Sequence, residues 1–338
     1  MGASLTVKKT AVVLLNLGGP SCLEDVRPFL FRLFYDAAII PLPNPLRYCV
    51  ARGLSRHRLK EATAIYQQLG GGSPLLENTQ LQAAALEATL GEGFRVFVAM
   101  RYAPPFAAET FETVRAWGAA EIVLLPLYPQ YSTTTTASAV NAWEKAATAT
   151  HGWKGAAAIP TRVIDAYPTL DGFLEAMVQL TLPHYQEAGC YGTPRLLLTA
   201  HGLPEKTIRR GDPYQRQVEE TARHFCEKLS VSLSTKVEVT LCYQSRVGPL
   251  KWIGPATDQE IIRAGQDKRP LVVVPIAFVS EHAETLVELD KTYRALAMTQ
   301  GCPRYARVET VQTHPLFIEA LASMVKGDML IEHEYTLS

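Results

Sequence analysis

The chain has 338 residues, of which 47% are hydrophobic and 20% charged, enough to bury the core of one large domain or two ordinary ones. Lys plus Arg and Asp plus Glu both number 33, so no basic excess points to a nucleic-acid partner. There is no run of about 18 apolar residues that would predict a membrane-spanning helix, and the opening residues lack a signal-peptide pattern. The six cysteines include no CxxC pair, so we expect reduced thiols in a cytoplasmic protein.

Short apolar runs recur along the chain, each followed by glycine, proline or polar residues. They cover 11–17, 95–100, 121–128 and 158–165, and then 195–200, 236–242, 271–278 and 306–312. Runs that are apolar on both faces predict parallel strands covered by helices. The intervening segments are long enough for crossover helices, of which 78–90 and 213–229 are the clearest.

The two halves of the chain also resemble each other. VLLPLYPQYS (123–132) aligns with VVVPIAFVSE (272–281), and LLNLGGP (14–20) aligns with LLTAHGLP (197–204). We therefore predict an α/β fold of two similar Rossmann-like domains, each with a mostly parallel four-stranded sheet flanked by helices. The alternative is a single large sheet.

The predicted domain boundary lies at Tyr167-Pro168. It gives an N-terminal domain over 1–167 and a C-terminal domain over 168–338, with the last helix expected to pack back on the first domain. In open parallel sheets ligands bind outside the carboxyl ends of the strands, and the unusual polar clusters follow predicted strands. These clusters are Asn16 to Gly19, Arg101-Tyr102, Tyr128 to Thr136, His201, Tyr243 to Arg246 and Ser280 to Glu284.

The acidic stretch 278–293 has two interpretations. Glu284 and Glu288 are four residues apart, which predicts one helical face where a cation or a proton would relieve their repulsion. The alternative is an acidic helix start favoured by the helix dipole. His201 likewise fits a buried or capping role, but an imidazole with carboxylates is also suited to divalent-metal binding or proton abstraction. A structural zinc site would need more closely spaced Cys or His.

Segment 39–66 begins proline-rich and apolar and then turns basic. It predicts either a lip over a flat, apolar, carboxylate-bearing ligand or a surface loop followed by a solvated helix. The glycine-rich stretch 70–74 matches neither common nucleotide-binding pattern, so a nucleotide site there is weakly indicated.

Taken together, eight motifs resemble the ferrochelatases. They are NLGGP (16–20), GGGSP (70–74), RY (101–102), PLYPQYS (126–132), AHGLP (200–204), RGDPY (210–214), VGPLKWIGPATD (247–258) and SEHAETLVELD (280–290). The resemblance implies a class II chelatase-like fold around a porphyrin cleft, with a lip at about 39–58. It implies a lyase, a metal chelatase that inserts Fe(II) into protoporphyrin IX to give protohaem with release of two protons, the last step of haem biosynthesis.

The resemblance also implies roles for individual residues. His201 and Glu284 would be catalytic, and the metal would meet His201, Glu284, His282 and Glu288. Asp290 would extend the acidic row, which meets Thr292 where many relatives have an acid. The implied substrate-binding residues are Leu17, Arg58, Tyr66, Ser73, Arg101, Tyr102, Tyr128, Ser132 and Trp252.

Fe(II) enters as substrate, and no prosthetic group is expected. Thr133 stands where some relatives have a cluster-binding cysteine and no cysteine follows Cys302, so we expect no iron–sulfur cluster. The expected partners are a porphyrin and ferrous iron, with no nucleic acid and with peripheral contact to the inner membrane through the lip. The alternatives are a coproporphyrin ferrochelatase, whose four propionates would need more basic donors, a cobalt chelatase acting on a corrin precursor, and a porphyrin or haem carrier without chemistry.

Overall fold

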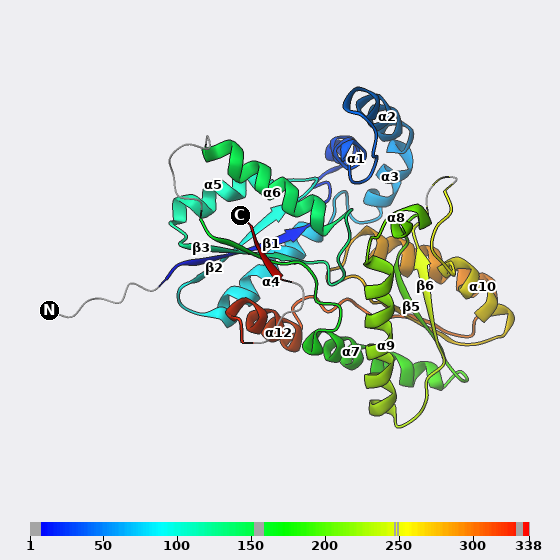
Figure 1. Ribbon diagram of the computed structural model, residues 1–338. Coiled ribbons are helices and arrows are strands. Elements are labelled where there is room, and N and C mark those ends of the chain that lie inside the picture. Colours follow the sequence, from blue (N-terminus) through cyan, green and yellow to red (C-terminus); the bar gives the residue numbers. More distant parts are fainter. Residues whose placement is uncertain (1–7, 152–158, 247, 249, 329–333, 338) are drawn as a thin grey trace. The chain divides into compact units, whose positions relative to one another are not determined.

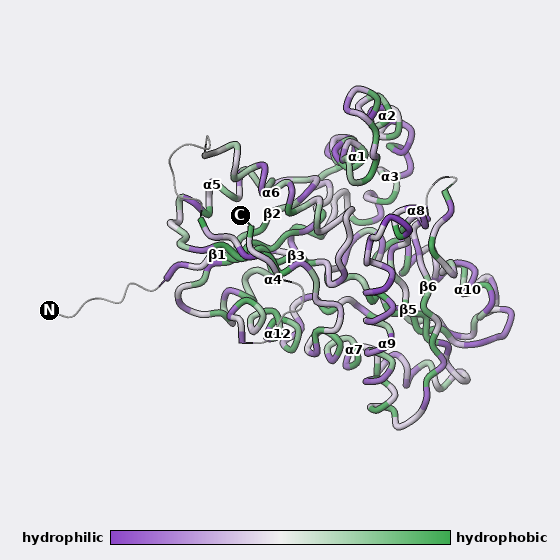
Figure 2. The backbone as a smooth tube through the Cα atoms, viewed as in Figure 1, coloured by the Kyte–Doolittle hydropathy of each residue, from purple (hydrophilic) through white to green (hydrophobic). Residues whose placement is uncertain are grey.

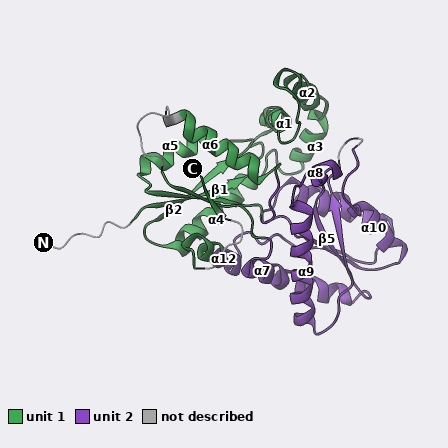
Figure 3. Cartoon of the chain, viewed as in Figure 1, with its two compact units in different colours: residues 1–128, 133–167, 321–338 green, residues 129–132, 168–320 purple. Residues whose placement is uncertain are grey.

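The computed structural model describes residues 8–151, 159–246, 248, 250–328 and 334–337 (Figure 1). They form two compact units, coloured separately in Figure 3. Unit 1 comprises residues 1–128, 133–167 and 321–338, and unit 2 comprises 129–132 and 168–320. Both differ from the expected ranges, because 129–132 joins unit 2 and 321–338 joins unit 1. Residue 158, the first of one expected strand, and Val247 and Pro249 of the VGPLKWIGPATD motif lie outside the described residues.

Unit 1 is built on a five-stranded sheet. Its order is β2 (Phe94–Met100), β1 (Thr10–Asn16), β3 (Glu121–Pro126), β4 (Thr161–Ile164) and β9 (Glu334–Leu337). The first four strands are parallel, as expected. The fifth corrects the prediction of four strands, because β9 pairs antiparallel with β4 from the far end of the sequence.

Unit 2 is built on a separate four-stranded sheet, which excludes a single large sheet. Its order is β6 (Val239–Gln244), β5 (Arg195–His201), β7 (Leu271–Pro275) and β8 (Tyr305–Arg307), all parallel. When β1 to β4 are matched with β5 to β8, the two sheets have the same strand order. The internal similarity predicted from the sequence is therefore confirmed at the level of topology.

Helices connect the strands in both units. In unit 1 they are α1 (Val26–Tyr35), α2 (Asn44–His57), α3 (Leu59–Gln67), α4 (Leu75–Leu90), α5 (Ala107–Trp117) and α6 (Thr136–His151), with a 3₁₀ turn η1 (Leu23–Asp25). In unit 2 they are α7 (Asp171–Gly189), α8 (Glu205–Arg209), α9 (Tyr214–Leu233), α10 (Thr257–Gln266), the π-helix η2 (Glu284–Tyr293) and α11 (Arg294–Thr299). Helix α12 (Pro315–Lys326) contains the division between the units. None of these described helices is long and apolar enough to cross a membrane.

The cores lie on the sheets. All seven residues of β1 and all five of β7 are buried, which is why the corresponding runs are apolar without alternation. Hydrophobic residues cluster along the strands of each unit in Figure 2. In unit 1 the fully buried Trp143 of α6 packs on Phe111 of α5 with ring centroids 5.4 Å apart.

Candidate active site

The carboxyl edge of the unit 2 sheet brings together residues from three segments. His201 is the last residue of β5 and pairs in register with Gln244, the last residue of β6. Strand β7 lies on the other side of β5, and the chain then runs through 276–283 into η2. Because the carboxyl ends of parallel strands share one edge, His201, Ser245 and the start of η2 meet there.

His201 forms an ion pair with Glu284. Its Nδ1 lies 2.9 Å from Glu284 Oε2, and Tyr214 OH donates a hydrogen bond to the His201 carbonyl at 3.0 Å. The side chain of His201 is 38% exposed and that of Glu284 is 28% exposed, so both can be reached from outside. This confirms that the two residues lie together, while their catalytic role stays a prediction.

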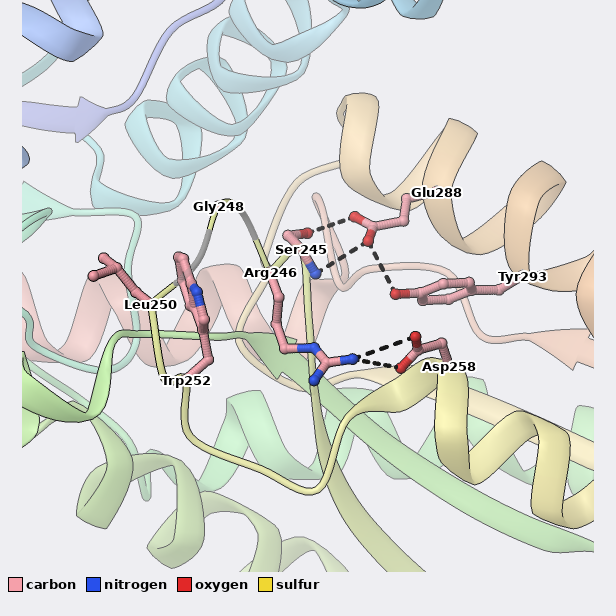
Figure 4. A pocket seen from close by; sticks show the side chains of 8 residues that line it. All are labelled: Ser245, Arg246, Gly248, Leu250, Trp252, Asp258, Glu288 and Tyr293. Atoms are coloured by element: carbon pink, nitrogen blue, oxygen red, sulfur yellow. Dashed lines mark hydrogen bonds and ion pairs between the residues drawn. The ribbon is translucent and has the colours of Figure 1, made fainter. Parts of the chain in front are cut away.

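Glu288 is held by hydrogen bonds from two residues besides Gln244. Its carboxylate accepts from Ser245 N–H at 3.1 Å, from Ser245 Oγ, and from Tyr293 OH at 3.0 Å (Figure 4). Ser245 Oγ also lies 3.2 Å from Glu284 Oε2, so a single hydroxyl bridges both carboxylates. The two glutamates therefore share a face, as predicted, although the helix that carries them is a π-helix.

Ser245 and Tyr293 are members of this site to which the sequence analysis gave no role. Ser245 belongs to a strand-end cluster that was noticed, but its φ of 61° could not be anticipated. That left-handed conformation costs a residue with a side chain about 1–2 kcal/mol, and backbone strain of this kind is concentrated at functional sites. Tyr293 is five residues beyond Glu288, a spacing that an α-helix would not place on the same face.

The charges at this edge alter one another's protonation. Burial opposes the charge on Glu284, but the charge and hydrogen bond of His201, with the charge of His282 and the Ser245 hydroxyl, together lower the pKa of Glu284 to about 2. Burial also opposes the charge on His201, while Glu284 and then Glu288 raise the pKa of the imidazole above its ordinary value. Burial and the negative charge of Glu284 raise the pKa of Glu288. The arrangement is therefore a histidine–carboxylate pair that favours the charged form of the imidazole, beside a second carboxyl group that holds its proton more tightly.

A cavity of about 300 Å³ adjoins Glu288. Its lining residues are Ser245, Arg246, Gly248, Leu250, Trp252, Asp258, Glu288 and Tyr293 (Figure 4). Arg246 and Asp258 form an ion pair at 3.1 Å on its wall. Trp252 lies opposite Pro204 in an isolated antiparallel bridge, which ties this wall to the loop that follows His201. Trp252 therefore lies beside the candidate site, while its contact with the substrate stays a prediction.

His282 forms its hydrogen bonds and ring contact within its own segment rather than with His201, Glu284 or Glu288. Its Nδ1 lies 3.0 Å from the Ser280 carbonyl oxygen, and its ring packs 4.6 Å from that of Phe278. Over the described part of the chain, no three His, Cys, Asp or Glu side chains are arranged to hold one metal ion. Asp290 also lies apart, since both its oxygens accept hydrogen bonds from Arg307. The four-residue metal set thus stays a prediction.

Ser132 belongs to unit 2 and is only 1% exposed. Its Oγ donates to Asp212 Oδ2 at 3.0 Å, and neighbouring Gln130 Nε2 donates to Thr221 Oγ1 at 2.9 Å. These bonds draw 129–132 into unit 2, which is the physical reason for the revised boundary. The position of Ser132 fits an internal hydrogen bond better than the substrate contact implied by the resemblance.

The carboxyl edge of the unit 1 sheet gathers several of the remaining predicted residues. Leu17 follows β1, and its carbonyl accepts a hydrogen bond from the Tyr102 N–H at 3.0 Å. Tyr102 is fully buried, and its OH donates to Asp36 at 2.8 Å. Arg101 pairs with the same carboxylate through NH2 at 2.7 Å and donates from Nε to Ser138 at 2.7 Å. Asp36 and Ser138 are thus members of this cluster that the sequence analysis did not identify.

The predicted residues near the lip have mixed environments. Arg58 joins α2 to α3 and forms an ion pair with Glu61 at 3.1 Å. Tyr66 is 8% exposed and packs edge-on against Phe29. Ser73 Oγ accepts from the N–H of Leu75 at 3.3 Å just ahead of α4, which begins at Leu75 rather than at the expected residue 78.

Tyr128 follows β3 at the unit 1 edge. It is partly buried, and its hydroxyl is enclosed without a hydrogen-bond partner among the described residues. A buried hydroxyl of this kind ordinarily has a partner. Tyr128 therefore remains a good candidate for contact with a ligand.

Solved structures define the class to which this fold belongs. SirB from Bacillus subtilis with Fe3+ is 14% identical, with a TM-score of 0.52 and 94% of each chain covered. The sirohydrochlorin chelatase SirB from Bacillus subtilis subspecies spizizenii, in complex with cobalt, is 13% identical, with a TM-score of 0.51 and the same coverage. At such identities the similarity establishes the fold alone, which is that of the class II chelatases.

Sequence comparison identifies the family. The family model described as Ferrochelatase matches residues 9–329. The chain is 49% identical over 327 residues to Ferrochelatase of Caulobacter vibrioides, covering 95% of this chain and 91% of the relative. It is 47% identical over 320 residues to Ferrochelatase of Wolbachia pipientis, covering 94% and 98%. The chain belongs to the ferrochelatase family, as the resemblance of its motifs implied.

Proposed function

We propose that this member of the family inserts ferrous iron into protoporphyrin IX, giving protohaem and two protons in the last step of haem biosynthesis. The observation that carries the proposal is the His201–Glu284 pair, 2.9 Å apart and partly exposed at the strand edge. Metal insertion requires two pyrrole protons to leave, and a positioned base contributes typically 10²–10⁴-fold to such a step. His201 is the proposed base or first metal ligand, and Glu284 is the acceptor that stabilises its charged form.

Glu288 and Ser245 extend the proposed path. The Ser245 hydroxyl lies within hydrogen-bond reach of Glu284 and Glu288, so a proton can pass between the carboxylates through one bridging group. The raised pKa of Glu288 suits a group that must hold a proton before releasing it.

The pairing of the basic residues favours protoporphyrin over coproporphyrin. Arg58 already pairs with Glu61, and Arg101 already pairs with Asp36. A substrate with four propionates would need several unpaired donors, whereas one with two propionates needs fewer.

The same proposal includes no iron–sulfur cluster, since Thr133 replaces the expected cysteine. We also propose action in the cytoplasm, with contact at the inner membrane through Leu46 and Tyr48, which are 53% and 46% exposed.

Anaerobic turnover by the purified protein tests the proposal. We expect iron-dependent loss of porphyrin fluorescence with protoporphyrin IX and a much slower loss with coproporphyrin III. His201→Ala should nearly abolish turnover while binding of metal-free porphyrin is retained. Faster turnover of coproporphyrin would assign the other substrate, and binding of porphyrin without any turnover by the wild type would indicate a carrier.

A further inference from the structure

The two carboxylates of the candidate site depend on the unusual winding of η2. Tyr293 reaches Glu288 across five residues, with its OH 3.0 Å from Glu288 Oε1. In an α-helix five residues correspond to a rotation of about 140° beyond a full turn, which would turn Tyr293 away from Glu288. The wider turns of a π-helix reduce this offset and bring the two residues closer to one face.

A π-helix of ten residues needs specific stabilisation, because π-helices are rare and occur mostly as single-turn bulges. Arg307 of β8 supplies it through contacts with Asp290 and Glu281. Its Nε and NH2 bind the two oxygens of Asp290 at 3.0 and 2.6 Å, a bidentate fork. Its NH1 binds Glu281 Oε1 at 2.6 Å, and Glu281 immediately precedes His282.

The contacts of Arg307 lie largely out of reach of solvent. The Arg307 side chain is 8% exposed and that of Glu281 is 10% exposed, so the bonds are little screened by solvent. Glu281 Oε1 also accepts from the Thr310 N–H at 2.9 Å, and Tyr305 OH donates to the Leu289 carbonyl at 2.7 Å. Strand β8 and the segment after it therefore contact Glu281, which precedes η2, and Leu289 and Asp290 in the second half of η2.

We propose that Arg307 is a positioning residue for the reaction, a clamp that fixes the winding of η2 and so places Glu284 and Glu288 at His201 and Ser245. Arg307 contacts none of these four residues. The inference rests on the proposed function, since it assigns Arg307 to the handling of iron and protons rather than to porphyrin binding. The short bidentate geometry, which a single ammonium group cannot reproduce, indicates why arginine is needed.

Arg307→Lys tests the clamp because it keeps the positive charge and removes the fork. We expect kcat/KM for iron to fall about 10–100-fold, the scale of a misplacement of about 1 Å, with unchanged affinity for metal-free porphyrin in fluorescence titration. Hydrogen exchange should be faster in 284–293. Arg294→Lys is the matched control on the solvent-exposed side. Arg294 meets the same Asp290 carboxylate at 3.8 Å and donates to the Asp290 and Tyr305 carbonyls at 3.0 and 3.2 Å, but its side chain is 45% exposed, so these contacts are screened by water. This control should leave kcat/KM for iron, porphyrin affinity and hydrogen exchange in 284–293 near the wild-type values.

Asp290→Asn provides a second variant if the lysine substitution unfolds the protein. It keeps the ion pair between Arg307 and Glu281, so kcat/KM for iron should fall less than in Arg307→Lys. Three results would overturn the clamp. In Arg307→Lys, the affinity for porphyrin could fall as much as kcat/KM for iron, or hydrogen exchange in 284–293 could be unchanged. Alternatively, Arg294→Lys could have effects as large as those of Arg307→Lys. Absence of turnover in the wild type would instead count against the proposed function, while the exchange comparison would still test the clamp.

Discussion

At the edge of the unit 2 sheet, residues of similar chemistry have opposite protonation behaviour. Glu284 is next to the His201 imidazole and loses its proton readily. Glu288, one turn further, keeps its proton longer because it is buried and lies beside the charge of Glu284. Groups whose pKa values are driven apart by their surroundings are suited to separate acid and base roles.

Replacement of the two glutamates should therefore cause graded damage. Glu284→Gln keeps the shape and removes the charge that raises the pKa of His201, so kcat should fall about 10²–10⁴-fold. An NMR titration of the imidazole should show the pKa of His201 lower than in the wild type, because the charged imidazole loses its partner. Glu288→Gln should lower kcat less and should mainly change the dependence on iron concentration. Greater damage from Glu288→Gln would reverse the two roles.

In unit 1, Asp36 collects hydrogen bonds from three side chains. Burial disfavours its charge, but hydrogen bonds from Ser138 and the Ala38 N–H, with the charge of Arg101, lower the pKa of Asp36. A lowered folded-state pKa means that the carboxylate contributes stability above about pH 4, the ordinary pKa of Asp. This stability is lost as the pH falls through the lowered value.

Asp36→Asn should lower the free energy of unfolding at pH 7 by about 1–3 kcal/mol, the cost of leaving buried partners unsatisfied. Urea unfolding from pH 7 to pH 3 should show the difference from the wild type shrinking below about pH 4. Asp171→Asn is the control, because its 78% exposed side chain forms only a surface pair with Lys228. A difference that stays constant with pH would show that packing, not charge, accounts for the effect.

Sequence reasoning found the strand-end residues because the carboxyl edge of a parallel sheet follows from the order of apolar runs. It located His201 and Glu284 correctly relative to each other. It could not tell that Tyr102 and Ser132 are buried, and their contact with the substrate stays a prediction. It also left out Asp36, which is far in sequence from its partner Arg101.

At the scale of whole elements, the two similar parallel sheets were predictable from the repeated apolar runs, whereas the order of the strands within each sheet was not predicted. The π-helix was not, because its residues have ordinary helix-forming composition and its winding depends on Arg307 and on Tyr293. Strand β9 was also missed. Its four residues pair with β4 although more than 160 positions separate them, as in Val163 with Tyr335.

Deleting residues 328–338 should therefore destabilise unit 1 without removing the unit 2 site. We expect faster hydrogen exchange in β4 (Thr161–Ile164) and a lower Tm, because β4 becomes an edge strand with unpaired backbone groups. Exchange in β5 and β7 should be unchanged. Equal loss of protection in both sheets would show that β9 supports the whole chain rather than its own sheet.

The whole molecule has two units whose segments are interleaved along the chain. Unit 1 receives three separate segments, and unit 2 receives 129–132 in addition to 168–320. Residues 129–132 join unit 2 through Gln130 and Ser132, and residues from 321 onward join unit 1 through Arg162, which donates to the Met324 carbonyl at 3.4 Å. Each unit keeps its own sheet despite this exchange of segments.

The late position of β9 has a consequence for synthesis on the ribosome. Every segment of unit 2 is translated before β9, so the sheet that carries His201 can form while the sheet of unit 1 still lacks its outermost strand. At about 5–20 residues per second, the roughly 170 residues between β4 and β9 take on the order of ten seconds or more to emerge. During that interval β4 presents an open edge, which can pair with another nascent chain. This is the stage at which a chaperone would protect the protein.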